Sequence, residues 1–163
     1  EKTEVRLATA SLMFYAVQNN QLTSESFLGN QIALSIFARV LSSERDVPVM
    51  YKCISIMDSA LAVCADGESF KLLTANVKGV DMFTIMTNKI ESLGSTAGPE
   101  KVLSTLALVA QKTEDESCMQ SLEVAVGKTM NVPKTMITKM IAPLCPQVDV
   151  NKHPKLHKQC RGH

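Results

Sequence analysis

Apolar residues recur along the chain at helical spacing, with polar residues between them. The densest stretch is 46–65, where apolar residues three and four positions apart form one stripe: Met50, Cys53, Ile54, Met57, Leu61 and Cys64. A neighbouring line widens the stripe with Val49, Ile56 and Val63. The pattern predicts that 46–65 is the longest and most buried helix, covered on two sides, with Asp46 as N-cap and Pro48 in the first turn.

Further apolar stripes predict more helices and no strands. The expected segments are 3–18 (capped by Thr3), 24–28, 31–41, 68–75, 81–92, 99–112, 116–126 and 133–141. One face of the first helix carries Val5, Ala8, Leu12 and Tyr15. The inward positions expected in 31–41 are Ile32, Leu34, Ile36, Phe37, Val40 and Leu41. Pro143, Pro146 and Pro154 interrupt the C-terminal remainder of the chain. The prediction is an all-α domain over 1–145 and an irregular, basic, His- and Lys-rich tail over 146–163.

The predicted helices recur in the order long, short, medium. The triplets Glu25-Ser26-Phe27, Glu68-Ser69-Phe70 and Glu116-Ser117-Cys118 lie 43 and 48 residues apart, and each opens the helix after a long one. A period in the forties built from three helices resembles the armadillo/HEAT superfamily, over about residues 3–145. The resemblance implies a right-handed superhelical solenoid of about two complete three-helix repeats with partial repeats at both ends. A non-repeating helical bundle is the alternative.

In armadillo-like proteins the third, long helix of each repeat lines a concave groove. The resemblance therefore implies that the polar strips of the three long helices form a partner-binding surface. The strips are Arg6, Thr9 and Met13, then Lys52, Ser55 and Ser59, then Lys101, Thr105 and Leu108. Evenly spaced cations with small polar neighbours favour an extended acidic peptide, or a helix, as the partner. An ordinary solvated surface is the alternative.

The distribution of charge argues against a general nucleic-acid binder. Residues 1–149 contain 16 acidic and 13 basic residues, a net charge of −3, whereas 150–163 contain four basic residues and no acid. A nucleic-acid-binding domain needs a large basic footprint, and here the basic residues concentrate in the predicted tail.

Two residue groups come close to known chemical motifs. Gly127-Lys128-Thr129 resembles the end of a phosphate-binding loop, but Leu122 stands where that motif requires glycine. A second group consists of competent zinc ligands: Cys145, His153, His157 and Cys160. Their spacing matches no standard zinc finger, and a proline separates the two histidines. We therefore expect no enzyme activity, no cofactor and no metal.

The cysteines and the hydropathy indicate a location. Five cysteines are an odd number, and Cys53 and Cys64 lie on the buried stripe, which predicts reduced core thiols. No apolar run approaches the roughly 18 residues of a membrane span, and no signal peptide is recognisable. The start at Glu1 suggests a piece of a larger protein, with a mature secreted chain as the alternative. The expected location is intracellular, cytoplasmic or nuclear, without membrane association.

Together these patterns predict a non-enzymatic protein–protein interaction scaffold that binds a peptide or a partner helix through its groove or its end. One alternative is a helical nucleic-acid-associated module. The other is a soluble helical carrier with a Met-rich apolar cavity, because several of the nine methionines recur at helical spacing: Met50, Met57, Met82, Met86, Met136 and Met140.

Overall fold

The computed structural model describes residues 2–64 and 81–161 of the chain. Over these ranges the structure is all-helical, as predicted, and contains no strand. The elements are α1 (Thr3–Val17), α2 (Gln21–Leu28), α3 (Gln31–Ser43), α4 (Val47–Ala62), α6 (Met82–Asn88), α7 (Ile90–Leu93), α8 (Gly98–Thr113), α9 (Glu116–Lys128), α10 (Lys134–Ile141), the 3-10 helix η2 (Ala142–Gln147) and α11 (Pro154–Cys160). The predicted helix at 68–75, with the second Glu-Ser-Phe triplet, lies outside the described residues.

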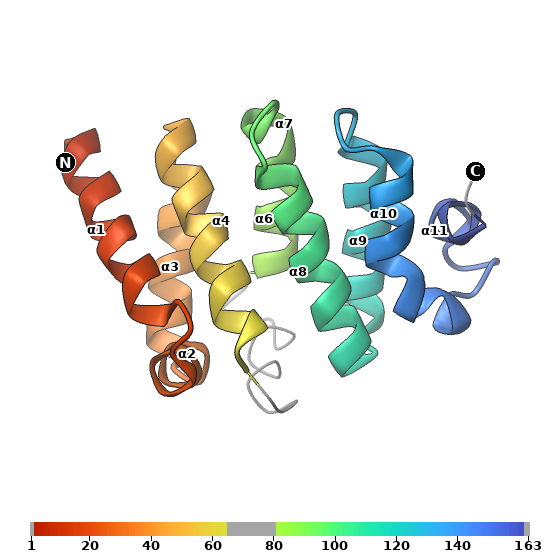
Figure 1. Ribbon diagram of the computed structural model, residues 1–163, viewed down its shortest axis with the longest axis horizontal. Helices are drawn as coiled ribbons and strands as arrows, with labels where there is room; N and C mark the ends of the chain where they lie inside the picture. Colours follow the sequence, from red (N-terminus) through yellow and green to blue (C-terminus); the bar gives the residue numbers. More distant parts are fainter. Residues whose placement is uncertain (1, 65–80, 162–163) are drawn as a thin grey trace.

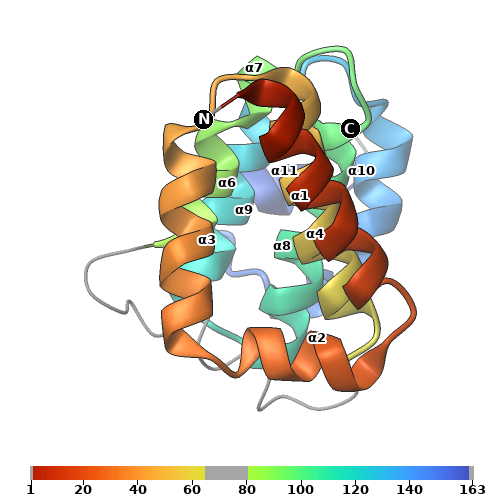
Figure 2. The ribbon, with the colours of Figure 1, turned by 90° about the vertical axis from the view of Figure 1, so that its left-hand side faces the viewer.

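Most of the described helices stand side by side in two rows along the longest axis of the molecule (Figure 1). The front row is α1, α4, α8 and α10, and each helix contacts the next. Behind it stand α3, α6 and α9, again in contact one after another. At the N-terminal end, α2 crosses from the front row to the back row (Figure 2). The chain therefore advances along the molecule by alternating between the rows, and a different pair of helices stands at each end of the rows.

The central stretch forms α4 largely as its sequence predicts. Asp46 is the N-cap, because its carboxylate accepts a hydrogen bond from the amide of Val49 at 3.2 Å, and Pro48 occupies the first turn. The helix ends at Ala62, and with 16 residues each α4 and α8 are equally the longest of the described helices. Asn30 and Asp115 cap α3 and α9 in the same way.

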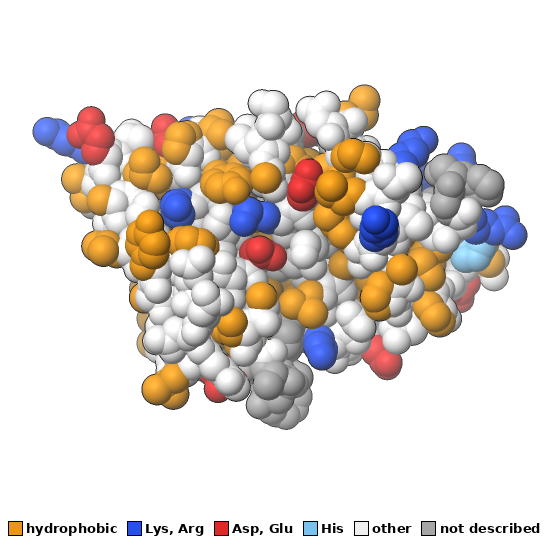
Figure 3. All heavy atoms as spheres, in the orientation of Figure 1, with side chains coloured by type: hydrophobic (Ala, Val, Ile, Leu, Met, Phe, Trp, Pro, Cys, Tyr) orange, Lys and Arg blue, Asp and Glu red, His pale blue; other side chains and the backbone are white. Residues whose placement is uncertain are grey.

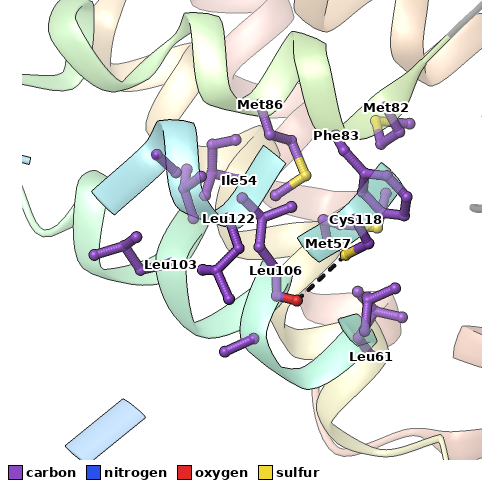
Figure 4. Packing of buried hydrophobic residues seen from close by; sticks show 14 of the residues in the cluster. Ile54, Met57, Leu61, Met82, Phe83, Met86, Leu103, Leu106, Cys118 and Leu122 are labelled. Carbon is purple, nitrogen blue, oxygen red and sulfur yellow. Dashed lines mark hydrogen bonds between the residues drawn. The ribbon is translucent and has the colours of Figure 1, made fainter. Parts of the chain in front are cut away.

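The core lies between the two rows. In Figure 4, side chains from α4, α6, α8 and α9 converge, among them Met57, Met86, Leu106 and Leu122. These side chains are almost completely buried, and each contributes about 2 kcal/mol by leaving water. Four of the methionines singled out in the sequence fill this core: Met50, Met57, Met82 and Met86. They are buried packing residues.

Several local predictions were wrong at helix ends. Thr3 begins α1 and makes no capping hydrogen bond; the N-cap position is Lys2. The single turn expected at 24–28 is a helix of eight residues, because the Asn20 side chain accepts from the amide of Thr23 and starts α2 earlier. The single helix expected over 81–92 is divided at Lys89 into α6 and α7.

The largest correction concerns residues 146–163, which were expected to form an irregular tail. This segment contains α11, which contacts α9, α10 and η2, and Leu156 of α11 is fully buried. Pro154 does not interrupt a helix; it occupies the first turn of one, where its missing amide hydrogen costs nothing. The described part of the segment is thus packed onto the helical domain.

Candidate protein-interaction surfaces

The nine residues predicted to bind a partner lie on α1, α4 and α8, three neighbouring helices of the front row. Figure 3 shows this side of the molecule, where basic side chains lie across the middle of the surface with acidic side chains beside them. The structure therefore brings the three predicted strips together. Their contacts decide how much of this surface a partner could use.

Arg6 is bound to Glu44, which lies at the end of α3. Its guanidinium donates hydrogen bonds to both Glu44 carboxylate oxygens, at 2.8 and 3.1 Å. The same carboxylate accepts from the backbone amides of Arg45 and Asp46, and Lys89 donates to the Glu44 carbonyl oxygen at 2.9 Å. The hydrogen bond from Arg6 lowers the pKa of Glu44 below its ordinary value, and the two amides add to that effect. Arg6 thus joins the two rows.

The two lysines of the strips also contact their neighbours. The Lys52 ammonium lies 4.8 Å from the centroid of the Phe14 ring, so it joins α4 to α1. The Lys101 ammonium lies 4.0 Å from a carboxylate oxygen of Asp58 and 5.5 Å from the Tyr51 ring centroid, so it joins α8 to α4. Burial nevertheless raises the pKa of Asp58 above its ordinary value, and Lys101 opposes this rise. Each lysine therefore stabilises a helix–helix contact.

Two of the small polar residues are buried and cannot meet a partner. Ser55 and Thr105 are each 2% exposed. The Ser55 hydroxyl donates to the Tyr51 carbonyl oxygen at 2.9 Å, and the Thr105 hydroxyl donates to Asp58 at 3.4 Å. Their assignment to a binding surface is wrong, because both side chains are buried between neighbouring helices of the front row. Thr9, Met13, Ser59 and Leu108 remain at least partly exposed.

A second surface, which shares Arg6, Thr9 and Met13 with the predicted strips, opens between α1, α3 and α4 at the N-terminal end. It is a groove of about 400 Å³, and its walls are almost entirely apolar: Ala10, Met13, Phe27, Ala33, Ile36, Phe37, Val40, Val49, Cys53 and Ile56. The polar residues at the groove are Arg6, which is held by Glu44, and Thr9, whose hydroxyl donates to the Val5 carbonyl oxygen. The groove therefore suits an uncharged, apolar occupant.

Exposed apolar side chains flank this groove on both helices. On α3, Ile32 is 69% exposed and Ile36 55%, and Val40 continues the same line four residues on. On α1, Leu12 is 72% exposed, and Val5 lies one heptad before it. At 100° per residue these side chains point away from the buried faces of their helices. We call the five residues, together with the groove, the N-terminal end face; Figure 2 looks onto this end of the molecule.

The sequence analysis placed the residues of this face correctly on apolar stripes but wrongly in the core. Ile32, Ile36 and Val40 were expected to point inward, yet the buried residues of α3 are Leu34, Phe37, Ala38 and Leu41. The sequence does indicate that some apolar residues of α3 are exposed. They lie on more sides of the helix than the neighbouring helices can cover. On α1, Leu12 and Tyr15 are likewise apolar side chains that no neighbouring helix covers.

At the opposite end, α11 closes the rows. A disulfide joins Cys145 of η2 to Cys160, the last residue of α11. The Gln159 side chain donates to the Lys134 carbonyl oxygen and to the Thr138 hydroxyl of α10, both at 3.0 Å. Two of the four residues considered as zinc ligands are thus bonded to each other. Over 2–64 and 81–161, no three His, Cys, Asp or Glu side chains are grouped to hold a metal ion.

The N-terminus of α11 is held by carboxylates of α9. One oxygen of Glu123 accepts hydrogen bonds from the backbone amides of Lys155 and Leu156, at 2.9 and 3.0 Å. The buried His153 ring contacts Glu116 through Nε2, and its Nδ1 lies 3.8 Å from the other oxygen of Glu123. Nδ1 makes no hydrogen bond. This cluster fixes the position of α11.

The remaining cysteines are buried thiols outside any disulfide: Cys53, Cys64 and Cys118. Cys53 and Cys64 lie in the core outside any disulfide, which agrees with the position expected for them, and their reduced state stays a prediction. Burial raises the pKa of Cys53 to about 11 and raises that of Cys118 further. Neither thiol forms the thiolate needed of a nucleophile near neutral pH.

Comparison with protein-family models, curated proteins and solved structures finds no significant match to this chain. The armadillo/HEAT resemblance therefore depends on helix order and period alone. Among the described helices, none combines the length and the apolar character required to cross a bilayer.

Proposed function

We propose that this protein is a non-enzymatic interaction module that binds an apolar helical surface of another protein chain at its N-terminal end face. The observation that carries the proposal is the apolar groove of about 400 Å³ flanked by exposed Leu12, Ile32 and Ile36. Monomeric proteins rarely expose contiguous apolar patches of this kind, and such patches mark interaction sites.

We also propose that the fold is a short armadillo/HEAT-like solenoid. The two rows of helices, in which each helix contacts mainly its neighbours, support this architecture. In such an array every helix pair buries one side against the preceding pair and the other against the following pair. An end pair therefore presents an apolar side that needs another covering.

Of the two binding modes expected from the sequence, the structure favours binding at the end over binding along the strips. Arg6, Lys52 and Lys101 contact Glu44, Phe14 and Asp58, so an acidic peptide would have to compete with contacts that already exist. An apolar helix meets no such competition at the end face. Helix-in-groove recognition uses apolar anchors at spacings i, i+3, i+4 and i+7, which match a long apolar groove.

The experiment uses a panel of fluorescein-labelled synthetic peptides, each an amphipathic helix with leucines at those spacings but a different register. Fluorescence anisotropy should show saturable binding of at least one peptide by the full chain. Ile36→Asp should weaken that binding by tenfold or more, because it places a charge at the mouth of the groove.

The matched control is Val124→Asp on α9, which adds the same charge at a position that is 42% exposed and lies away from the end face. Both variants should keep the circular dichroism and melting midpoint of the native chain, since exposed positions tolerate such changes. Equal binding by the two variants, or no binding across the panel, would contradict the proposed function.

One observation favours the second candidate function, a carrier of a small apolar ligand. A volume of about 400 Å³ falls within the range of small-molecule sites. A fatty-acid titration that saturates at one molecule per chain and is abolished by Ile36→Asp, with no peptide binding, would favour the carrier. The groove has only one methionine in its lining, so it is not the Met-rich cavity expected from the sequence.

The intracellular location expected from the sequence stays a prediction. The three buried thiols are compatible with it, whereas the Cys145–Cys160 disulfide favours an oxidising compartment. Alkylation in denaturant at the moment of cell lysis, which exposes the buried thiols, followed by a count of the labelled cysteines, distinguishes the two: three labels indicate an intact disulfide and five a reducing location.

A further inference from the structure

We propose that the disulfide between Cys145 and Cys160 is a redox-sensitive switch: its reduction releases α11 from the end of the helix rows, and its re-formation docks α11 again. The bond joins η2 to the last residue of α11. The proposal concerns the C-terminal end of the molecule, so it does not depend on the partner proposed for the N-terminal end face. It adds a conformational change that the redox environment of the chain controls.

Among the five cysteines, Cys145 and Cys160 are the two that a reductant can reach. Both residues are partly exposed, whereas the cysteines outside the disulfide are buried: Cys53, Cys64 and Cys118. Thiol–disulfide exchange requires access to a sulfur atom, so exposure decides which cysteines react. A change in redox conditions should therefore alter this one bond and leave the three core cysteines as they are.

The reductant that the switch requires is a dithiol, and the exchange has two steps. A thiolate of the dithiol attacks one sulfur of the disulfide, so the bond between Cys145 and Cys160 breaks, a mixed disulfide forms, and the other cysteine leaves as a thiolate that takes up a proton. The second thiol of the reductant then loses its proton and attacks the mixed disulfide. The protein gains two thiols, and the dithiol loses two electrons and two protons as it becomes a cyclic disulfide. Exchange with a disulfide oxidant reverses both steps.

The position of α11 depends on this bond because the helix is short. It has seven residues, which form a marginal helix in water, and its one fully buried apolar side chain is Leu156. The disulfide joins residues 15 apart in the sequence, and opening a loop of this size should raise the population of released α11 on the order of 100-fold. The switch therefore acts on the equilibrium between docked and released α11.

The remaining contacts of α11 are mainly polar, which makes the released state accessible. Glu123 accepts two hydrogen bonds from the first turn of α11, and Gln159 donates two to α10. Water can replace these partners when α11 leaves, so their net contribution to docking is modest. Docking also leaves Nδ1 of the buried His153 without a hydrogen bond, a cost that release into water removes. The covalent bond thus offsets a weak non-covalent contact.

Release of α11 should leave the helix rows folded. Its main contacts are with α9, α10 and η2 at the end of the molecule (Figure 1). It contributes one buried residue, Leu156, to the apolar core, whereas the side chains that converge between the rows come from α4, α6, α8 and α9. Reduction should therefore expose the sides of α9 and α10 that α11 covers and leave the other helices packed.

The test is hydrogen exchange of the full native chain, followed by mass spectrometry, before and after incubation with dithiothreitol, a dithiol. Alkylation without denaturant should label two cysteines, Cys145 and Cys160, only after reduction. The α11 amides should then exchange at least tenfold faster, while the amides of α1 and α4 keep their native rates. Reoxidation with a disulfide oxidant should restore the slow exchange. The control is the double variant Cys145→Ser/Cys160→Ser, in which α11 should exchange rapidly with or without the dithiol.

Several outcomes would overturn the proposal. If the dithiol yields no labelled cysteine in the folded chain, the bond is not accessible to reduction. If two cysteines are labelled but α11 keeps its protection, the bond does not control docking. Faster exchange in α1 and α4 as well would make the disulfide a support of the whole domain, and failure to regain protection on reoxidation would exclude a reversible switch. A double variant that still responds to the dithiol would locate the effect elsewhere.

Discussion

The two ends of the helix rows differ in how their apolar surfaces are covered. At the N-terminal end, α1 and α3 expose Leu12, Ile32 and Ile36, and nothing in the described structure lies over them. At the C-terminal end, α11 lies against α9 and α10 and buries Leu156 completely. Its outward positions are occupied by exposed charged residues such as Lys155 and Lys158.

This difference shows what an array of helix pairs needs at its ends. Each end pair has an apolar side without a neighbour, so helical-repeat proteins require terminal caps with a polar outer face. Here α11 covers one end of the rows, where it is held by a fully buried leucine, a disulfide, the hydrogen bonds that Glu123 accepts and those that Gln159 donates. The other end remains apolar, and it is where we place the partner.

The largest effect should come from placing the same charge at both ends. Leu156→Asp buries an unpaired carboxylate beneath α11 and should lower the free energy of unfolding by about 3 kcal/mol or more. Leu12→Asp, at a position that is 72% exposed, should change it by no more than about 0.5 kcal/mol. Urea denaturation of the native chain and the two variants measures both losses. Equal losses at the two ends would contradict the distinction between a covered end and an open one.

Removing the disulfide should weaken the C-terminal end alone. Cys145 and Cys160 are 15 residues apart, and a bond that closes a loop of this size contributes about 3 kcal/mol. Cys160→Ser should therefore speed hydrogen exchange of the α11 amides, because seven residues form a marginal helix without support. Amides of α1 and α4 serve as the internal control and should exchange at the native rate. Unchanged protection of α11 would show that the cap does not depend on the disulfide.

A smaller, pH-dependent effect is expected at the N-terminal end from Glu44. Its pKa is lowered in the folded state, so its contribution to stability is present above its ordinary value of 4.5 and is lost as the pH falls through the lower, folded value. Glu44→Gln should cost about 2 kcal/mol at pH 7 and flatten the loss of stability below pH 4.5. Glu4→Gln, at an exposed position on α1, is the control. If Glu44→Gln loses as much stability below pH 4.5 as the native chain does, other carboxyl groups cause that loss.

The smallest expected effect concerns the cap that Glu123 forms on α11. Glu123→Ala leaves the amides of Lys155 and Leu156 without their acceptor and should cost about 1 kcal/mol. Glu123→Gln keeps an acceptor oxygen and should cost less than the alanine variant. The melting midpoints of the native chain, Glu123→Gln and Glu123→Ala measure the order of their stabilities. An alanine variant as stable as the native chain would show that water replaces the carboxylate at no cost.

The sequence by itself determined most of the described helices and several of their N-caps. Asp46, Asn30 and Asp115 cap their helices because a side-chain oxygen and an amide three residues later are brought together by the chain itself. The stripe from Met50 to Leu61 is buried as predicted, since spacing within one helix decides which residues share a face. The burial of Cys53 and Cys64 followed from the same stripe.

Only the tertiary structure decided which apolar faces are covered. Ile36 and Leu41 both lie on the apolar side of α3 in the sequence pattern, but α6 contacts only one side of the helix, and Ile36 remains exposed. The partners of the basic residues were equally beyond local reasoning: Glu44 is 38 residues from Arg6. Helical periodicity shows which residues lie on the same side of a helix. The helix that covers that side, or the residue that forms an ion pair there, comes from a distant part of the chain. For the same reason the bond between Cys145 and Cys160, and with it the order of the C-terminal segment, could not be predicted from spacing.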